Sequence, residues 1–372
     1  AFAGKFNKGP LDEVVSISSE QELVATFGKP DSTNFEDFFS AANFLQYSNA
    51  LRVVRVQNSS VSNATESGSA FVIKNTTDYQ DNYASGQASV GLWAARTAGA
   101  FGNSLQISTC PSATAYEEVN KTTVADAAMA VGDTVVTVTS AAGITAGDIV
   151  NFGDEYEYRV VSVATNDLNI VRKDEPAYFG TSESSGLHQA PTNGAQVRRR
   201  WKYYDLFDKA PGTSPYAQAK SGVNDELHIV VIDEDGDITG TKGDVLEKFE
   251  AVSKASDAKT AQGSVNYYPD VIYKASNYIY WMDHNAGGSN WGSAANGTTF
   301  TDVTSVSNVS LQAGSDGTAA TIGQRKTAYE KFQDGETVDV GLIIAGAGDA
   351  THIGNLITIA ENRKDAVVFA SP

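Results

Sequence analysis

The chain has 372 residues, of which 19% are charged, and it carries a formal net charge of −18 from 27 Lys and Arg against 45 Asp and Glu. This acidic balance argues against a basic surface that binds nucleic acid. The single cysteine, Cys110, excludes an internal disulfide framework and a Cys-based zinc site, and is expected to be a small buried thiol. No run reaches the ~18 apolar residues of a membrane span, and the length predicts two or three domains.

The first 56 residues predict two strands and two helices. Residues 14–17 form a short apolar run, and Ser19 with Glu22 has the spacing of a capping box for a helix that ends at Gly28. A second helix is expected to be capped near Thr33. Its predicted buried face consists of Phe35, Phe38, Phe39, Ala42 and Leu45.

Residues 51–56 predict a buried strand that contains two arginines. Arg52 and Arg55 are either ion-pair residues of an interface or charges at the edge of a sheet, and the second interpretation is slightly favoured. Residues 57–90 are rich in Ser, Asn, Thr and Gly, which predicts a long exposed connection. Gly99 and Gly102 precede a strand at 105–107, where they predict a tight turn rather than a phosphate cradle.

Residues 112–199 differ in character from the rest. Short alternating runs at 134–139, 149–152, 155–163 and 168–171 predict a small all-β barrel or sandwich. Residues 180–188 and 194–197 are expected to form its closing hairpin. Arg198, Arg199 and Arg200 then follow as a charge run, interpreted as a solvated strand end, with a docking patch for an acidic neighbour as the alternative.

The central block runs from 224 to 280. Residues 227–232 predict a strand with both faces covered, and residues 233–237 a hairpin turn with an Asp-Gly signal. Asp244 with Glu247 suggests another capping box, and Val245, Leu246, Phe249 and Val252 lie at helical spacing, so 244–253 is predicted to be a helix. A second strand is expected through Tyr280.

Several residues of this block invite a metal interpretation. Asp233, Asp235 and Asp237 have the one-three-five spacing of a calcium loop, but the sixth position, which must be Gly, is Ile238. A hairpin turn is therefore preferred. His228 is expected to be a packed strand residue, and His284 beside Asp283 is expected to point away from it.

Residues 284–320 predict loops and weak strands, followed by a short helix at 327–333. A βαβ unit closes the chain, with a buried strand at 338–345, a helix capped by Asp349 or Thr351, and a strand at 366–370. Gly346 and Gly348 lie where a dinucleotide-binding turn would have glycines, but the third glycine position is Thr351. A tight βα turn is the preferred interpretation.

Several segments, in this order, resemble the tail sheath proteins of contractile-tailed phages, most closely the T4-like sheath family of large tailed phages. They span most of the chain outside 112–199. The segments are residues 4–10, 27–30, 44–56, 99–107, 245–253, 267–268, 275–278, 346–348, 363–365 and 369–372.

The resemblance implies a discontinuous α/β sheath core with an inserted β-rich domain. The expected domains are 1–58 with 336–372, 59–111 with 200–335, and the insert 112–199. It further implies a virion protein that is assembled in the host cytoplasm and contracts around an inner tail tube, with neighbouring sheath subunits, baseplate and tail terminator as partners. No catalytic residue, cofactor or metal site is expected, nor any nucleic-acid or membrane partner. The chain is expected to be a trimmed fragment that stays monomeric.

Two other functions remain open from the sequence. A cell-surface or glycan-binding protein would suit the Tyr-, Gly- and Ser-rich composition and the β-rich insert. A nucleotide-binding enzyme would suit the Gly346–Gly348 turn, although the rest of the fingerprint is missing.

Overall fold

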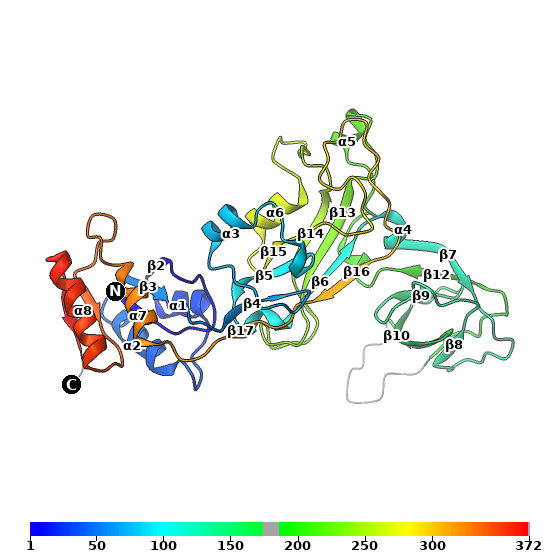
Figure 1. The fold of residues 1–372 in the computed structure, drawn as a ribbon. Coiled ribbons are helices and arrows are strands. Elements are labelled where there is room, and N and C mark those ends of the chain that lie inside the picture. The colour runs from blue at the N-terminus through cyan, green and yellow to red at the C-terminus, as the bar shows by residue number, and fades with distance from the viewer. Residues whose placement is uncertain (174–185, 371–372) are drawn as a thin grey trace.

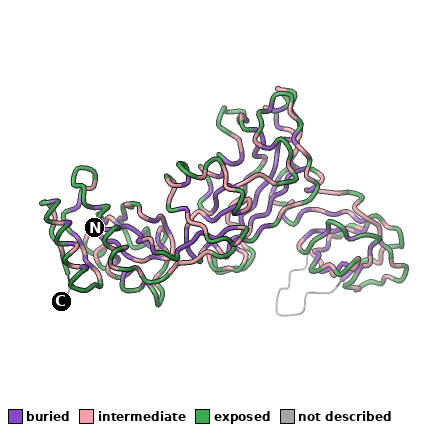
Figure 2. The backbone as a smooth tube through the Cα atoms, in the orientation of Figure 1, coloured by how far each residue is buried: buried purple, intermediate pink, exposed green. Residues whose placement is uncertain are grey.

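The computed structural model describes residues 1–173 and 186–370. They form an elongated molecule in which three lobes follow one another (Figure 1). We call these the terminal lobe (residues 1–56 and 320–370), the central lobe (57–116 and 201–319) and the barrel lobe (117–200). Each lobe has its own buried interior (Figure 2). In the part of the chain described, no helix is long and apolar enough to cross a membrane.

A mixed sheet forms the centre of the terminal lobe. β3 (Leu51–Arg55) lies between β1 (Phe2–Gly4), which runs parallel to it, and β2 (Val14–Ile17), which runs antiparallel. The alternating and β-branched residues that predicted strands at 14–17 and 51–56 are therefore in strands, and both predictions are confirmed.

α1 (Glu20–Phe27) has the predicted start. The hydroxyl of Ser19 accepts the amide proton of Glu22 at 3.2 Å, which satisfies a helix N–H group that has no partner within the helix. The Glu22 carboxylate in turn accepts from the amide of Ser18 at 2.7 Å. In a capping box this second bond would come from the amide of Ser19, so here it comes from one residue earlier than predicted.

α2 (Phe35–Leu45) is present, but its predicted buried face is wrong in part. Phe38 and Ala42 are buried, whereas the side chains of Phe35 and Phe39 are 48% and 47% exposed. Asp37 is buried instead, because its carboxylate accepts from the Lys5 amide at 2.7 Å and pairs with Arg325 at 3.2 Å. These bonds turn the helix so that one flank of the aromatic stripe faces outward.

The closing βαβ unit is confirmed as a parallel pair. β18 (Leu342–Ile344) pairs with β19 (Val367–Phe369), and the side chain of Asp349 accepts from the amide of His352 at the start of α8 (Ala350–Arg363). The first strand is shorter than the predicted 338–345. β18 also lies beside β1, since the Ile344 amide donates to the carbonyl of Ala1 at 2.9 Å.

Helices cover both faces of the β1-β3-β2 sheet. α1 and α2 pack on one face through a cluster that includes Phe2, Leu23 and Phe38. α7 (Ile322–Glu330) and α8 pack on the other, in a cluster that includes Tyr329, Ile343 and Leu356. α7 begins five residues before the helix predicted at 327–333, because Thr321 and Gln324 form a capping box that was not predicted.

The central lobe contains two four-stranded sheets, ordered β14-β13-β6-β16 and β15-β5-β4-β17. Its largest buried cluster includes Trp93, Ile229 and Tyr268. The strands are β4 (Val61–Thr65), β5 (Trp93–Ala98), β6 (Leu105–Cys110), β13 (Glu226–Asp233), β14 (Asp244–Ser253), β15 (Ile279–Trp281), β16 (Ser307–Ser310) and β17 (Ser315–Asp316). The short helices are α3 (Thr76–Asn82), α4 (Ala113–Tyr116), α5 (Pro215–Ala219) and α6 (Tyr268–Ala275).

The predicted exposed connection at 57–90 is wrong, because it contains β4 and α3. Every residue of β4 is buried although three of the five are polar. Asn63 donates to the Ala95 carbonyl at 2.9 Å and accepts from the Ile73 amide at 2.7 Å. Tertiary hydrogen bonds thus make a polar segment compatible with the interior.

The helix predicted at 244–253 is also wrong, because this segment is β14, paired antiparallel with β13. The register shifts twice, once on each side of Phe249, and each shift places an extra residue in β14. Two such bulges convert the two-residue period of a strand into a three-residue period for Leu246, Phe249 and Val252. That spacing resembles one face of a helix.

The barrel lobe is a six-stranded sheet ordered β7-β12-β9-β10-β11-β8. An antiparallel bridge between Val124 and Val138 joins the ends of the two outer strands, so the sheet closes on itself. The strands are β7 (Glu117–Thr123), β8 (Val135–Thr137), β9 (Ile149–Asn151), β10 (Tyr158–Ala164), β11 (Asp167–Arg172) and β12 (Gln196–Arg200). The four predicted strands overlap β8 to β11, whereas β7 was missed. The hairpin expected at 180–188 lies largely outside the described residues.

Candidate assembly surface

The acidic turn after β13 is built around one carboxylate. Asp233 is buried, and its oxygens accept from the hydroxyl of Ser104 at 2.6 Å and from the amides of Gly236 and Thr239 at 3.0 and 2.7 Å. These bonds outweigh the effect of burial, which by itself raises the pKa, so the pKa of Asp233 lies below its usual value. The carboxylate that began the proposed calcium spacing therefore organises a hairpin turn.

His228 and Cys110 are packed residues of neighbouring strands. His228 Nδ1 accepts from the amide of Ala251 at 2.9 Å, which leaves Nε2 to donate to the carbonyl of Lys209 at 2.8 Å. Both ring nitrogens are used, as expected for a structural histidine. Burial raises the pKa of the Cys110 thiol to about 12, so the nucleophilic thiolate is scarce near neutral pH.

His284 lies among aromatic side chains. Its Nδ1 is 2.6 Å from the hydroxyl of Tyr268, and its ring centroid is 4.9 Å from that of Trp281. The Asp283 carboxylate instead accepts from the backbone amide of His284. Across the described ranges, no group of three or more His, Cys, Asp or Glu side chains has the arrangement of a metal site.

A side chain of α8 occupies the space beside the Gly346–Gly348 turn where a nucleotide phosphate would bind. His352 packs so close to Gly348 that a Cβ there would come within 2.3 Å of the imidazole. The imidazole Nε2 bonds the Ala345 carbonyl at 2.9 Å, and Asp349 occupies the helix start with a carboxylate. A negative charge at that position opposes a phosphate rather than attracting one.

Two of the five arginines of β3 and β12, Arg55 and Arg199, are buried. Arg55 is buried between the terminal and central lobes, where it donates to the carbonyls of Phe6, Gly9 and Ala98 at 2.7 to 2.8 Å. Its interpretation as an edge charge is wrong, because β3 is the middle strand. Arg199 is also buried and pairs with Asp148 at 3.2 Å, so the solvated strand end predicted for 198–200 is wrong at this residue.

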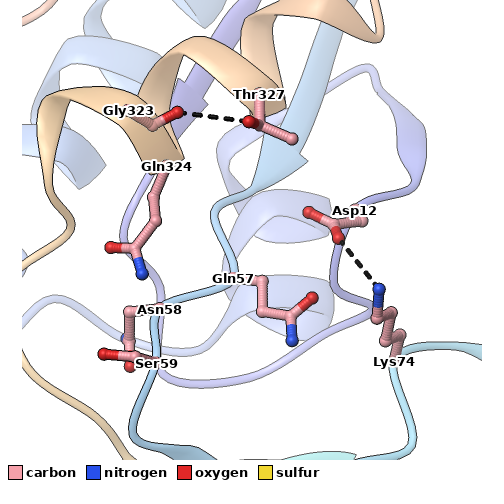
Figure 3. Close-up of a pocket in the computed structure, with 8 residues that line it drawn as sticks. All are labelled: Asp12, Gln57, Asn58, Ser59, Lys74, Gly323, Gln324 and Thr327. Atoms are coloured by element: carbon pink, nitrogen blue, oxygen red, sulfur yellow. Dashed lines mark hydrogen bonds and ion pairs between the residues drawn. The ribbon is translucent and has the colours of Figure 1, made fainter.

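One polar hollow lies where the terminal and central lobes meet (Figure 3). It has a volume of about 360 Å³, and its two charged residues, Asp12 and Lys74, pair with each other at 3.6 Å. The other lining residues are Gln57, Asn58, Ser59, Gly323, Gln324 and Thr327. The lining residues of this hollow do not form a nucleophile–base pair of the kind used in covalent catalysis.

The feature that sets the terminal lobe apart is an open apolar face on β18 and β19. Leu342 pairs with Val367 and Ile344 with Phe369, so these four side chains share one face. Val367 and Phe369 are 59% and 58% exposed. α8 covers only the opposite face, through Ile343. Parallel strands are normally buried on both faces, so this face fits an interaction site.

α2 adds a second apolar element on the same side of the sheet. Its exposed Phe35 and Phe39 are one helical turn apart, and α2 shares a buried cluster with Ile344 of β18. We call Leu342, Val367, Phe369, Phe35 and Phe39 together the outer apolar surface. Phe35 and Phe39 were predicted to lie in the core, and this surface was not predicted. The sequence did contain one hint of this surface. The apolar stripe predicted on α2 is wider than the face that one small sheet can bury.

Comparison with known proteins identifies relatives of the chain. Residues 1–56 match the family described as "Tail sheath protein Gp18 domain III N-terminal region". The tail sheath protein of Salmonella phage ViI is 27% identical over 386 residues, covering 100% of this chain and 56% of the relative. The resemblance to phage tail sheath proteins is confirmed. The tail sheath protein of Enterobacteria phage T4 is 51% identical over 55 residues, covering 15% of this chain and 8% of the relative.

All of this chain aligns with the ViI protein, but the chain spans only about half of that relative's length. Two solved structures are also similar. The sheath tail protein of Desulfitobacterium hafniense has 10% identity and a TM-score of 0.38, covering 99% of this chain and 47% of that one. The sheath tail protein of Listeria innocua has 10% identity and a TM-score of 0.39, covering 98% of this chain and 44% of that one.

Proposed function

We propose that the chain is a structural part of a contractile phage tail sheath, in which copies stack helically around a tail tube and contract to drive it through the host envelope. The match to sheath proteins carries this proposal, since the ViI relative aligns with the entire chain. The outer apolar surface supports it, because assembly of copies would cover side chains that are otherwise left in water. The energy of contraction resides in contacts between subunits, and no bound nucleotide is needed.

The proposed contact is heterologous. A helical array forms when one patch of a subunit binds a different patch on the next, so that the rotation does not close into a ring. The open face of β18 and β19 suits this role, since a neighbour can cover it with an apolar segment or extend the sheet beyond β19. Burying Val367 and Phe369 contributes roughly 1.5 to 3 kcal/mol for each side chain that becomes fully covered.

The domain organisation belongs to the same proposal. Residues 1–58 with 336–372 form one sheath domain, 59–111 with 200–335 a second, and 112–199 an inserted β-rich domain. The separate apolar clusters of the three lobes support a division into three units, although residues 320–335 pack with the terminal lobe. The inner tube, the baseplate and the tail terminator are the proposed partners besides other sheath subunits, in a particle assembled in the host cytoplasm. A non-enzymatic role is consistent with the packed states of Cys110, His228 and His284.

The test uses the full-length polypeptide that carries this sequence. We expect the unaltered protein to form tubes that sediment in a high-speed spin, and the double variant Val367→Asp, Phe369→Asp to remain in the supernatant, because charged side chains oppose burial of the contact. Val161→Asp, at an exposed position of the barrel lobe, is the matched control and should sediment normally. Thermal melts should show both variants folded. Equal sedimentation of the double variant would rule out this surface as the contact.

A further inference from the structure

The barrel lobe joins the central lobe through two adjacent strands and has a separate core. The chain enters at Glu117 of β7 and leaves at Arg200 of β12, and these two residues are paired in the sheet. Tyr158 and Val197 belong to the barrel cluster, while Trp201 belongs to the cluster beneath β6 and β13. No described residue belongs to both clusters. Apolar packing therefore does little to fix the angle between the two lobes.

Polar contacts around Tyr204 cross the junction instead. Tyr204 lies in a one-turn 3-10 segment of the central lobe, Tyr204–Leu206. Its hydroxyl donates to Glu157 of the barrel lobe at 2.6 Å and accepts from the ammonium of Lys173 at 2.6 Å. The cationic groups of Lys173 and Arg200 lie 4.3 and 4.9 Å from the centre of its ring. Tyr204 therefore contacts two cationic side chains and one carboxylate of the barrel lobe.

Further ion pairs extend the same network. Arg200 contacts Glu117 at 3.0 Å and Glu157 at 2.5 Å, and Lys173 reaches Asp205 of the central lobe at 3.5 Å. Burial raises the pKa of Glu157, but the hydrogen bonds from Tyr204 and Lys173 outweigh that effect and leave the pKa below its usual value. The side chains of Lys173, Arg200 and Glu157 keep about a quarter of their surface in water, 28%, 24% and 24%.

A second contact of the junction is fully buried. The guanidinium of Arg199 pairs with Asp148 inside the barrel lobe and donates to the carbonyl of Ala115 in α4 at 2.8 Å. Both ionic side chains of this pair are 2% exposed. Salt screens exposed charges far more than buried ones. The junction therefore combines a salt-insensitive pivot at Arg199 with a salt-sensitive cluster at Tyr204.

We infer that the cluster of Tyr204, Glu157, Lys173 and Arg200 is an electrostatic latch that sets the orientation of the barrel lobe, which pivots about Arg199 when the latch opens. The barrel lobe is then a separately oriented unit that can keep or change its angle when the rest of the molecule moves. The inference stands on the junction alone and holds whether or not the chain acts in a sheath.

The test measures the distance between the two lobes by pulsed electron paramagnetic resonance. Spin labels are placed at Ser162→Cys in the barrel lobe and Ser256→Cys in the central lobe, both exposed positions, in a Cys110→Ala background. We expect one narrow distance distribution at low salt and a broader one at about 1 M salt, where the screening length falls to about 3 Å. Tyr204→Phe removes the hydroxyl but keeps the ring, and should give the broad distribution already at low salt.

The neighbouring residue supplies the control. The Tyr203 ring is buried beside Trp201, and its hydroxyl has no hydrogen-bond partner among the described residues, so Tyr203→Phe should leave the distribution narrow. Glu157→Gln is a second latch variant and should behave as Tyr204→Phe does. A narrow, salt-independent distribution in Tyr204→Phe or in folded Glu157→Gln would overturn the latch, as would equal broadening in Tyr203→Phe.

Discussion

At the scale of single residues, several charged and polar side chains are buried where backbone carbonyls or carboxylates form hydrogen bonds with them. Lys254 is 0% exposed and donates to the carbonyls of Pro111 and Asn224 at 2.7 and 2.8 Å. Its ammonium also lies 5.2 Å from the centre of the Trp291 ring. Burial lowers the pKa of Lys254 to about 8, although Asp302 and Asp225 act in the opposite direction. Among the described residues no carboxylate forms an ion pair with it, and because its pKa differs between the folded and unfolded chain, folding stability depends on its protonation.

This pKa predicts that Lys254 makes the folded state more stable as pH rises. Between about pH 8 and 10 the unfolded chain keeps the lysine proton, with a pKa of about 10.4, while the folded chain releases it. The free energy of unfolding should therefore gain up to roughly 2 kcal/mol from this residue across that range. Urea unfolding of wild type and Lys254→Met at several pH values measures the gain.

In that experiment the stability difference between the two proteins should change with pH. Lys259→Met, at an exposed position, is the control and should follow wild type. A constant difference between wild type and Lys254→Met from pH 7.5 to 10 would contradict the assignment.

At the scale of elements, local capping signals located some helix starts, but they missed the start of α7 and predicted a helix where β14 lies. Ser19 was predicted as a cap, and Asp349 was one of two predicted candidates with Thr351, because a cap depends on residues only three or four positions away. β14 could not be recognised, since its helical spacing arises from two bulges that only pairing with β13 reveals. β4 was missed because its polar side chains find their partners far along the chain, as Ser62 does at Ala313.

The bulge in β14 lets us predict whether a glycine substitution raises or lowers the free energy of unfolding. Ala251 has a φ of +48°, in the left-handed region that costs an L-residue with a Cβ roughly 1 kcal/mol. Ala251→Gly should therefore raise the free energy of unfolding by about 0.5 to 1 kcal/mol. In a helix the same change would lower it by about 1 kcal/mol.

Denaturant unfolding distinguishes the two signs. Ala360→Gly, inside α8, is the matched control and should be destabilising. If Ala251→Gly lost as much stability as Ala360→Gly, the bulged strand would be the wrong description of this segment.

At the scale of the whole molecule, the resemblance to a known family predicted more about the protein than the residue patterns did. The order of short segments indicated a resemblance to tail sheath proteins, and the alignment of the entire chain with the tail sheath protein of phage ViI confirms that resemblance. The outer apolar surface could not be predicted, because exposure of Phe35, Phe39 and Phe369 depends on how α2 and α8 are placed on one small sheet. A helix pattern shows which residues are apolar but not which of them a neighbouring subunit covers.

The central claim is that copies of this chain bind one another through the terminal lobe. Cryo-electron microscopy of particles assembled from the full-length polypeptide tests it most directly. We predict helical tubes in which Val367 and Phe369 of β19, together with Phe35 and Phe39 of α2, lie within contacts between subunits. Particles without helical order, or tubes in which these four side chains remain exposed to solvent, would contradict the account.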